Sequence, residues 1–135
     1  MKTILIIDAD LGFVFWLGQA LDRHGYQAVP AKTVSDAASL LGQFKTKVDL
    51  LIANPSLEGI ATLVKRLRRS QRNLKVIAVS ADPHSPGLEG ADATKSKPSA
   101  LEDISELDWL ELVRSVFEDA TPEQLKKGRI IVDRR

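Results

Sequence analysis

The stretch Ile-Leu-Ile-Ile-Asp-Ala-Asp at residues 4–10 decides the fold of this chain. Its four consecutive large apolar residues fit a strand that is buried on both faces, as in a parallel sheet covered by helices. Two more apolar runs of this kind and two weaker runs follow along the chain. The five runs together predict strands over residues 3–8, 27–30, 48–54, 75–80 and 93–96.

Segments with helical periodicity lie between and after these strands. Asp10 is a good N-cap for the first of them, and Gly25 supplies its C-terminal stop. The expected helices cover residues 11–24, from Thr33 or Ser35 to 43, 60–71 and 106–119. Alternating strands and helices predict an α/β fold with a doubly wound, five-stranded parallel sheet in the order 2-1-3-4-5.

Length and composition fit one compact domain. The chain has 135 residues, of which 44% are hydrophobic and 27% charged, and its net charge is +1. The absence of cysteine excludes disulfides, thiolate metal sites and cysteine nucleophiles. Neither a signal peptide nor a membrane span is evident in the apolar runs, so we expect a cytoplasmic protein.

Polar residues stand where four of the predicted strands end: Asp8, Asn54, Ser80 and Lys97. In an open parallel α/β sheet, the crevice beyond the carboxyl ends of the strands is where ligands bind and chemistry occurs. We therefore expect an acid, an amide, a hydroxyl and an ammonium group to converge in one site.

This order and spacing resemble the receiver domain of two-component response regulators over about residues 2–119. The strongest segment is Gly-Ala-Asp-Ala-Thr-Lys-Ser-Lys-Pro at residues 90–98, which is similar to the family's stretch ending in Lys-Pro. The resemblance implies a flavodoxin-like (CheY-like) fold. It also implies a site in which two adjacent acids and an acceptor aspartate hold magnesium.

Two positions depart from the family's pattern. Asp8 falls on the first acid, but Ala9 stands at the second and Asn54 at the phosphate-accepting aspartate. A neutral carboxamide is a poor nucleophile for forming an acyl phosphate. The loss of two carboxylates also removes most of the electrostatic attraction for magnesium. We therefore expect no cofactor and no bound metal, with Asp8 as a weak candidate ligand.

The remaining site positions match the family's pattern only in part. By the resemblance, Ser80 and Lys97 retain the family's hydroxyl and cation, and Thr94 stands where the family often has an aromatic switch residue. Asp10 is interpreted as a helix cap, with a role as a weak acid as the alternative. We expect Lys97 to pair with Asp8 or with the Asn54 side-chain oxygen, because a semi-buried cation needs a partner.

The segment after Ser80 is too short for the family's usual fourth helix. Prolines and a glycine within it predict a loop or a single turn over residues 82–89, so the fourth helix should be shortened or missing. We assign residues 1–120 to the receiver-like domain. Residues 121–135 form a C-terminal extension with a short helix followed by a strand or a linker.

The leading hypothesis is a pseudo-receiver, not an enzyme, that binds a protein partner without being phosphorylated. The resemblance implies a histidine kinase, a phosphotransfer protein or an output domain as partner, with Phe15 and Trp109 on the contact surface. One alternative is a receiver that is still phosphorylated or responsive to a phosphodonor in a phosphorelay; another is a small-ligand-binding flavodoxin-like domain. A homodimer is compatible with the sequence. Neither a membrane nor a nucleic acid is an expected partner, because the basic run 65–75 fits a solvated helix face.

Overall fold

The computed structural model describes residues 1–44, 47–81, 87–97 and 105–118. The chain divides into two compact units, Met1–Ile104 and Ser105–Arg135. The first unit contains the whole sheet and three helices, and the described part of the second is a single helix. The boundary that the sequence predicts after residue 120 lies outside the described residues and stays a prediction.

The first unit is built on a five-stranded sheet in the order β2-β1-β3-β4-β5, in which every neighbouring pair is parallel. The predicted topology is therefore confirmed. Strands β1 and β3 consist wholly of buried residues, as expected for strands that are covered on both faces. The strands are β1 (Thr3–Ile7), β2 (Gln27–Ala31), β3 (Leu50–Ala53), β4 (Lys75–Ser80) and β5 (Ala93–Ser96).

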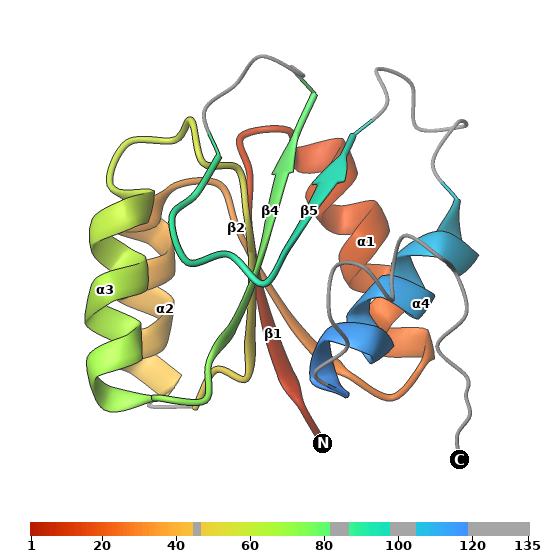
Figure 1. Ribbon diagram of the computed structural model, residues 1–135, viewed down its shortest axis with the longest axis horizontal. Helices are drawn as coiled ribbons and strands as arrows, with labels where there is room; N and C mark the ends of the chain where they lie inside the picture. The colour runs from red at the N-terminus through yellow and green to blue at the C-terminus, as the bar shows by residue number, and fades with distance from the viewer. Residues whose placement is uncertain (45–46, 82–86, 98–104, 119–135) are drawn as a thin grey trace. The chain divides into compact units, whose positions relative to one another are not determined.

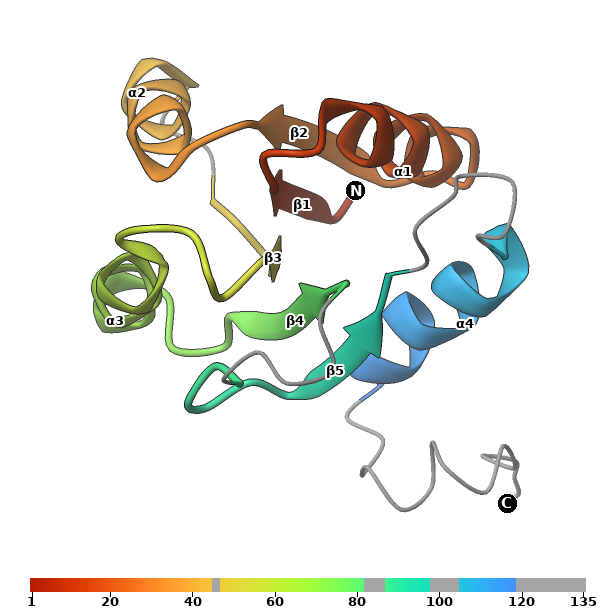
Figure 2. The ribbon, with the colours of Figure 1, turned by 90° about the horizontal axis from the view of Figure 1, so that it is seen from above.

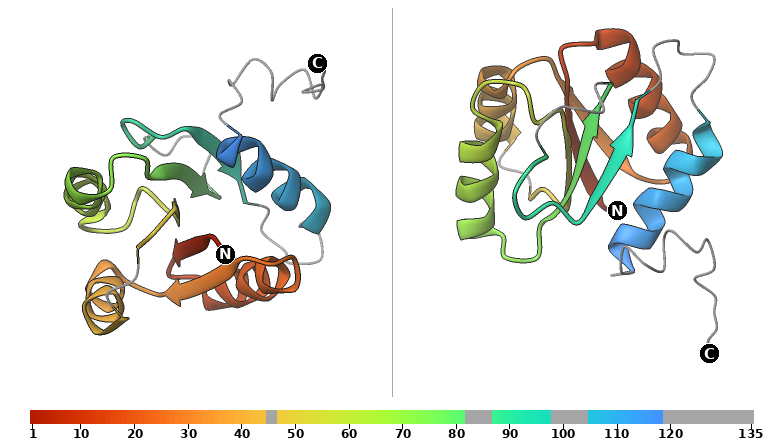
Figure 3. Two further views of the ribbon diagram at one scale, coloured as in Figure 1. Left: turned by 90° about the horizontal axis from the view of Figure 1, so that it is seen from below. Right: turned by 45° about the horizontal axis from the view of Figure 1, so that its top comes forward.

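Three helices cover the two faces of this sheet. Helix α1 (Leu11–Arg23) lies on one face, and α2 (Val34–Phe44) and α3 (Ile60–Ser70) lie on the other (Figures 1 and 2). The view from below shows the same two layers (Figure 3). The strands all run toward one edge, where the arrowheads of β4 and β5 end in Figure 1. The loops that can carry a site are therefore gathered at that edge.

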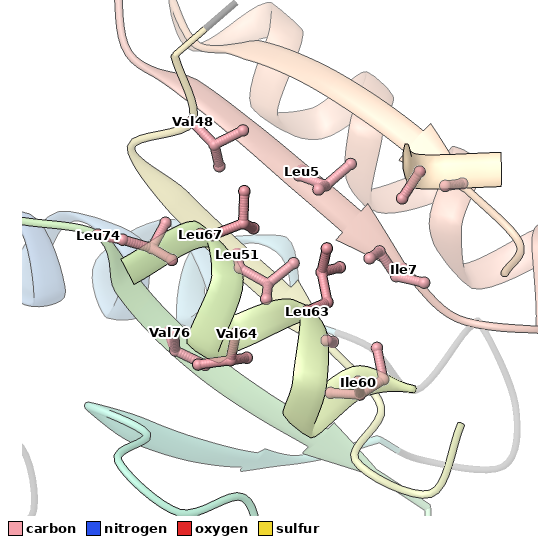
Figure 4. Packing of buried hydrophobic residues seen from close by; sticks show 13 residues of the cluster. Leu5, Ile7, Val48, Leu51, Ile60, Leu63, Val64, Leu67, Leu74 and Val76 are labelled. Atoms are coloured by element: carbon pink, nitrogen blue, oxygen red, sulfur yellow. The ribbon is translucent and has the colours of Figure 1, made fainter. Parts of the chain in front are cut away.

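The core between the sheet and helices α2 and α3 is purely apolar. Leu5 and Leu51 are fully buried, and Leu63, Val64 and Leu67 of α3 belong to the same cluster (Figure 4). Burial of a leucine side chain contributes about 1.5–3 kcal/mol, so this cluster fixes the register of the central strands and with it the positions of their ends.

A side-chain clamp holds the connection between β4 and β5. Arg68 donates from Nη1 to the Gly90 carbonyl oxygen at 2.8 Å and from Nη2 to Asp92 Oδ2 at 3.1 Å. Gly90 has a φ of 80°, which favours glycine, and a Cβ there would lie 2.6 Å from Arg68 Nη1 and displace the guanidinium group from the clamp. Leu88 and Ala91 pack against the core cluster from this segment. The clamp anchors the described residues of this connection that precede β5.

No helix occurs among the described residues of that connection, Ala81 and 87–92. This agrees with the expectation of a missing fourth helix for the part that can be checked. Residues 82–86 lie outside the described part of the chain, as do the expected short helix and strand within 121–135. None of the described helices has the length and apolar character needed to span a membrane.

The second unit contributes helix α4 (Glu106–Phe117). The Ser105 side chain caps it by accepting a hydrogen bond from the Asp108 backbone N–H at 3.1 Å. Trp109 is only 1% exposed, so the prediction that its side chain lies on an exposed contact surface is wrong. The reason is its spacing: Trp109, Val113 and Val116 repeat at i, i+4 and i+7 and form the buried stripe of the helix.

Candidate functional site

The predicted site residues follow four strands that end at one edge of the sheet. Backbone hydrogen bonds continue the strand pairing one step beyond the strands. The Asn54 N–H donates to the Ile7 carbonyl oxygen at 3.1 Å, and the Lys97 N–H donates to the Ser80 carbonyl oxygen at 3.0 Å. Asn54 is therefore fixed beside the end of β1, and Lys97 beside the end of β4.

Lys97 and Asp8 form a buried ion pair across this edge. Lys97 Nζ lies 3.0 Å from Asp8 Oδ2, and the two side chains are only 8% and 2% exposed. Asp8 Oδ1 accepts a second hydrogen bond, from the Asp10 backbone N–H at 3.0 Å. Both carboxylate oxygens of Asp8 are thus engaged by the protein's own donors. The expectation that Lys97 turns to Asp8 or to Asn54 is confirmed in favour of Asp8.

Asp10 has two roles at once. Its Oδ1 accepts from the Phe13 N–H at 3.2 Å, which makes Asp10 the N-cap of α1 as predicted. Its Oδ2 lies 3.5 Å from Lys97 Nζ, so the same carboxylate also faces the ammonium group. The Asp10 side chain is 49% exposed, and solvent therefore weakens this second ion pair relative to the one with Asp8.

The ring of Phe13 completes the surroundings of Lys97. The ammonium nitrogen lies 5.0 Å from the ring centroid, within the range of a cation–π interaction. Phe13 is itself fully buried on the inner face of α1. The buried ring and the two carboxylates together hold the lysine head group in one place.

Asn54 is held by its own loop. Its side-chain Oδ1 accepts from the Ser56 N–H at 3.0 Å and from Ser56 Oγ at 2.7 Å. This is the local hydrogen bonding by which asparagine stabilises turns. The oxygen that would replace a carboxylate oxygen is consequently directed to Ser56.

The other predicted residues lie around this centre. Ser80 ends β4 and is half-buried, and Ala9 is exposed between the two acids. Thr94 is exposed and pairs with Ala78 in the sheet, so it sits two residues short of the strand end where Ser96 pairs with Ser80. The structure therefore gathers Asp8, Asp10 and Lys97 in direct contact, with Asn54 and Ser80 at the same edge.

The donor set does not fit a magnesium ion. Magnesium needs hard oxygen ligands in nearly octahedral arrangement. Both Asp8 oxygens already accept hydrogen bonds, the second acid position is Ala9, and the Asn54 oxygen is engaged by Ser56. Within the described residues no group of three or more His, Cys, Asp or Glu side chains could hold a metal ion. The ammonium group of Lys97 instead supplies the positive charge beside Asp8.

Sequence reasoning missed two contributors. Ser56 could have been found, because Asn-Pro-Ser at residues 54–56 is a pattern in which the asparagine oxygen caps the following turn. Phe13 and Lys97 are far apart in the sequence, so no local pattern indicates their contact. It depends on the conformation of the lysine side chain in the folded protein.

Comparison with solved structures identifies proteins of the same architecture. A CheY-like response regulator receiver domain protein from Methanospirillum hungatei JF-1 is 25% identical, with a TM-score of 0.68 over 95% of this chain and 99% of that one. The response regulator TrrA from Thermotoga maritima, solved in complex with Mg²⁺–BeF, is 24% identical, with a TM-score of 0.63 over 86% of this chain and 99% of that one. The chain thus has the fold of response regulator receiver domains.

A third similar structure is a response regulator receiver modulated diguanylate cyclase from Pelobacter carbinolicus. It is 23% identical to this chain, with a TM-score of 0.65 over 87% of this chain and 93% of that one. No protein-family model and no curated protein matches the sequence.

The buried ion pair yields a stability prediction. Lys97→Met leaves the Asp8 carboxylate buried without its cation, and removal of one partner of a buried pair costs about 3–5 kcal/mol. The double variant Asp8→Asn/Lys97→Met should lose less than the sum of the single variants, with a coupling of about 1–3 kcal/mol. Urea unfolding of the wild type, Asp8→Asn, Lys97→Met and the double variant measures the loss of stability and the coupling.

Lys47→Met is the matched control, because Lys47 lies 3.8 Å from Asp49 in a pair whose lysine is 69% exposed. That change should cost about 1 kcal/mol or less. Equal effects at positions 47 and 97 would contradict the role given to the buried pair.

Proposed function

We propose that this chain is a receiver-like signalling module that binds its protein partner without being phosphorylated at the usual position. The observation that carries the proposal is the ion pair between Lys97 and Asp8, at 3.0 Å, in a site whose acceptor position is Asn54. Lys97 and Asp8 neutralise each other, and the acceptor position has an amide in place of a carboxylate.

Asn54 lacks the chemistry of an acceptor. Forming an acyl phosphate requires a carboxylate oxygen that attacks phosphorus, and a carboxamide is neutral and weakly nucleophilic. Its oxygen also accepts two hydrogen bonds from Ser56, at 3.0 and 2.7 Å, which lowers its availability further.

Pro55 protects this neutral state. Asparagine usually deamidates when the backbone nitrogen of the next residue loses its proton and attacks the side-chain carbonyl carbon. Proline has no backbone N–H, so this route from Asn54 to aspartate is closed. The site should therefore keep its amide as the protein ages.

The proposed partner is a protein of two-component signalling, such as a histidine kinase, a phosphotransfer protein or an output domain. The similarity to receiver domains supports this class of partner. The proposed location is the cytoplasm. We assign no enzymatic activity to the chain itself, because the site offers an engaged acid, an amide and an engaged lysine.

The contact surface is proposed to include Phe15. This side chain is 53% exposed on the outer side of α1, next to Leu11 at 40%. With Pro30 and Leu40 they line a groove of about 480 Å³ beside edge strand β2. The free edge of β2 offers few backbone donors to a partner strand. The Ala28 N–H already donates to Asp22 Oδ1, and Pro30 has no backbone N–H. The partner is therefore expected to contribute a helix with apolar side chains.

The wild-type protein should be inert toward small phosphodonors. Incubation with magnesium and acetyl phosphate should add no phosphoryl mass, as measured by intact-protein mass spectrometry, because the acceptor is an amide. A stable phosphorylated species of the wild type, mapped to any residue of the site, would refute the proposal.

The double variant Ala9→Asp/Asn54→Asp is the positive control for that experiment. It restores both missing carboxylates, while Ser80 and Lys97 remain in place. We expect it to gain a phosphoryl adduct under the same conditions. Hydroxylamine should remove this adduct, because an acyl phosphate on the restored carboxylate at position 54 is open to attack at its carbonyl carbon.

Partner binding should be constitutive. Phe15→Ala should weaken binding of an isolated partner about tenfold or more, which corresponds to loss of a buried aromatic anchor of about 1.4 kcal/mol. Ser80→Ala and the addition of acetyl phosphate should leave the affinity unchanged, as measured by calorimetry. An affinity that rises sharply with the phosphodonor would count against the proposal.

A further inference from the structure

Helix α3 and the turn that follows it carry a concentration of positive charge. Between residues 59 and 81 the sequence has no aspartate or glutamate at all. The same segment contains the cations Lys65, Arg66, Arg68, Arg69, Arg72 and Lys75. The net charge of the whole chain is only +1, so this segment is a local concentration of charge.

Most of these cations lie on the solvent side of the helix. Leu63, Val64 and Leu67 form the inner face and pack into the core (Figure 4). Lys65, Arg66 and Arg69 are exposed on the outer side of α3, and Arg72 is exposed in the turn after it. Figure 2 shows that α3 borders the first unit with one side turned away from the sheet. We call these four side chains the basic stripe.

The basic stripe has no counter-ions in the described part of the chain. Arg68, which is outside the stripe, is used by the clamp to Gly90 and Asp92, and its side chain is only 30% exposed. The four stripe residues form no ion pair and no side-chain hydrogen bond among the described residues. No acidic side chain in the described part of the chain therefore neutralises these four charges.

Like charges lie next to each other within the stripe, although Arg69 in the last turn also interacts favourably with the helix dipole. Lys65 and Arg69 are four residues apart and Arg66 and Arg69 three apart, which places like charges next to each other on the helix surface. Such pairs destabilise a helix, and a glutamate at one of these positions would convert repulsion into attraction. The stripe thus presents several like charges close together, which attracts anions.

We propose that the basic stripe binds the phosphate backbone of a nucleic acid. Three of its four cations are arginines, whose planar guanidinium groups match phosphate oxygens in bidentate geometry. A lipid surface fits less well, because membrane-binding helices add large apolar side chains to their cations. The exposed large hydrophobic residues of the described chain are elsewhere, at Met1, Leu11, Phe15 and Leu107. The sequence alone predicts a solvated face here; the missing counter-ions are what the structure adds.

The number of cations in the stripe sets the expected salt dependence of binding. Four phosphate contacts give a slope of about −3.6 for the logarithm of the association constant against the logarithm of salt concentration. The affinity for duplex DNA should therefore fall roughly 100-fold between about 50 and 200 mM salt. Binding should be independent of base sequence, because no side chain of the stripe is held in position to read base edges.

The test uses the full chain and a fluorescein-labelled DNA duplex of arbitrary sequence, with fluorescence anisotropy across a salt series. Lys65→Glu should weaken binding at least tenfold and reduce the salt slope. The same change places a carboxylate four residues before Arg69, so the melting temperature should stay the same or rise. Lys32→Glu is the matched control, since Lys32 is exposed, lies outside α3 and changes the net charge equally.

The outcomes separate the proposal from its rivals. Weaker binding by Lys65→Glu, with unchanged stability and an unchanged Lys32→Glu control, supports it. Equal losses in both variants would show a net-charge effect and overturn it. So would the absence of binding by the wild type, or binding to vesicles containing phosphatidylserine without binding to the duplex. None of these outcomes depends on the phosphorylation state of the site, so the proposed signalling function is tested separately.

Discussion

The ion pair between Lys97 and Asp8 is the interaction on which the character of the site depends. Both charged groups are buried, and either would destabilise the fold without a partner of opposite charge. They form an ion pair at 3.0 Å. Asp10 and the Phe13 ring then confine the ammonium group from two further directions. A cation supplied by the protein thus stands beside the acid, and both oxygens of the buried carboxylate are engaged.

Strand pairing and one side-chain clamp position this cluster. Apolar strands pair in parallel, and their register brings residues that are 89 positions apart into hydrogen-bond distance. The short connection between β4 and β5 is anchored by Arg68 from the neighbouring helix. One arginine of α3 therefore has a structural role, while its neighbours on the basic stripe form no ion pair with the described residues.

Much of this arrangement could be predicted from the sequence, because it rests on local signals. Apolar runs indicated the strands, and Asp10 marked the start of α1. Choices between nearly equivalent partners could not be predicted. Lys97 was expected to turn to Asp8 or to the Asn54 side-chain oxygen, and the structure favours Asp8 because the Asn54 oxygen accepts hydrogen bonds from Ser56. Trp109 was misjudged, although its spacing with Val113 and Val116 is that of the buried face of α4.

The central claim is that a site with Ala9 and Asn54 in place of two carboxylates, and with Lys97 paired to Asp8, does not bind a magnesium ion. A titration of the ¹⁵N-labelled wild type with magnesium chloride, followed by amide correlation spectra, tests it most directly. The account predicts that the amide signals of Asp8, Ala9, Asn54 and Lys97 show no saturable shift in the millimolar range. Saturable shifts confined to these residues would show that magnesium displaces Lys97 from Asp8, and would contradict the account.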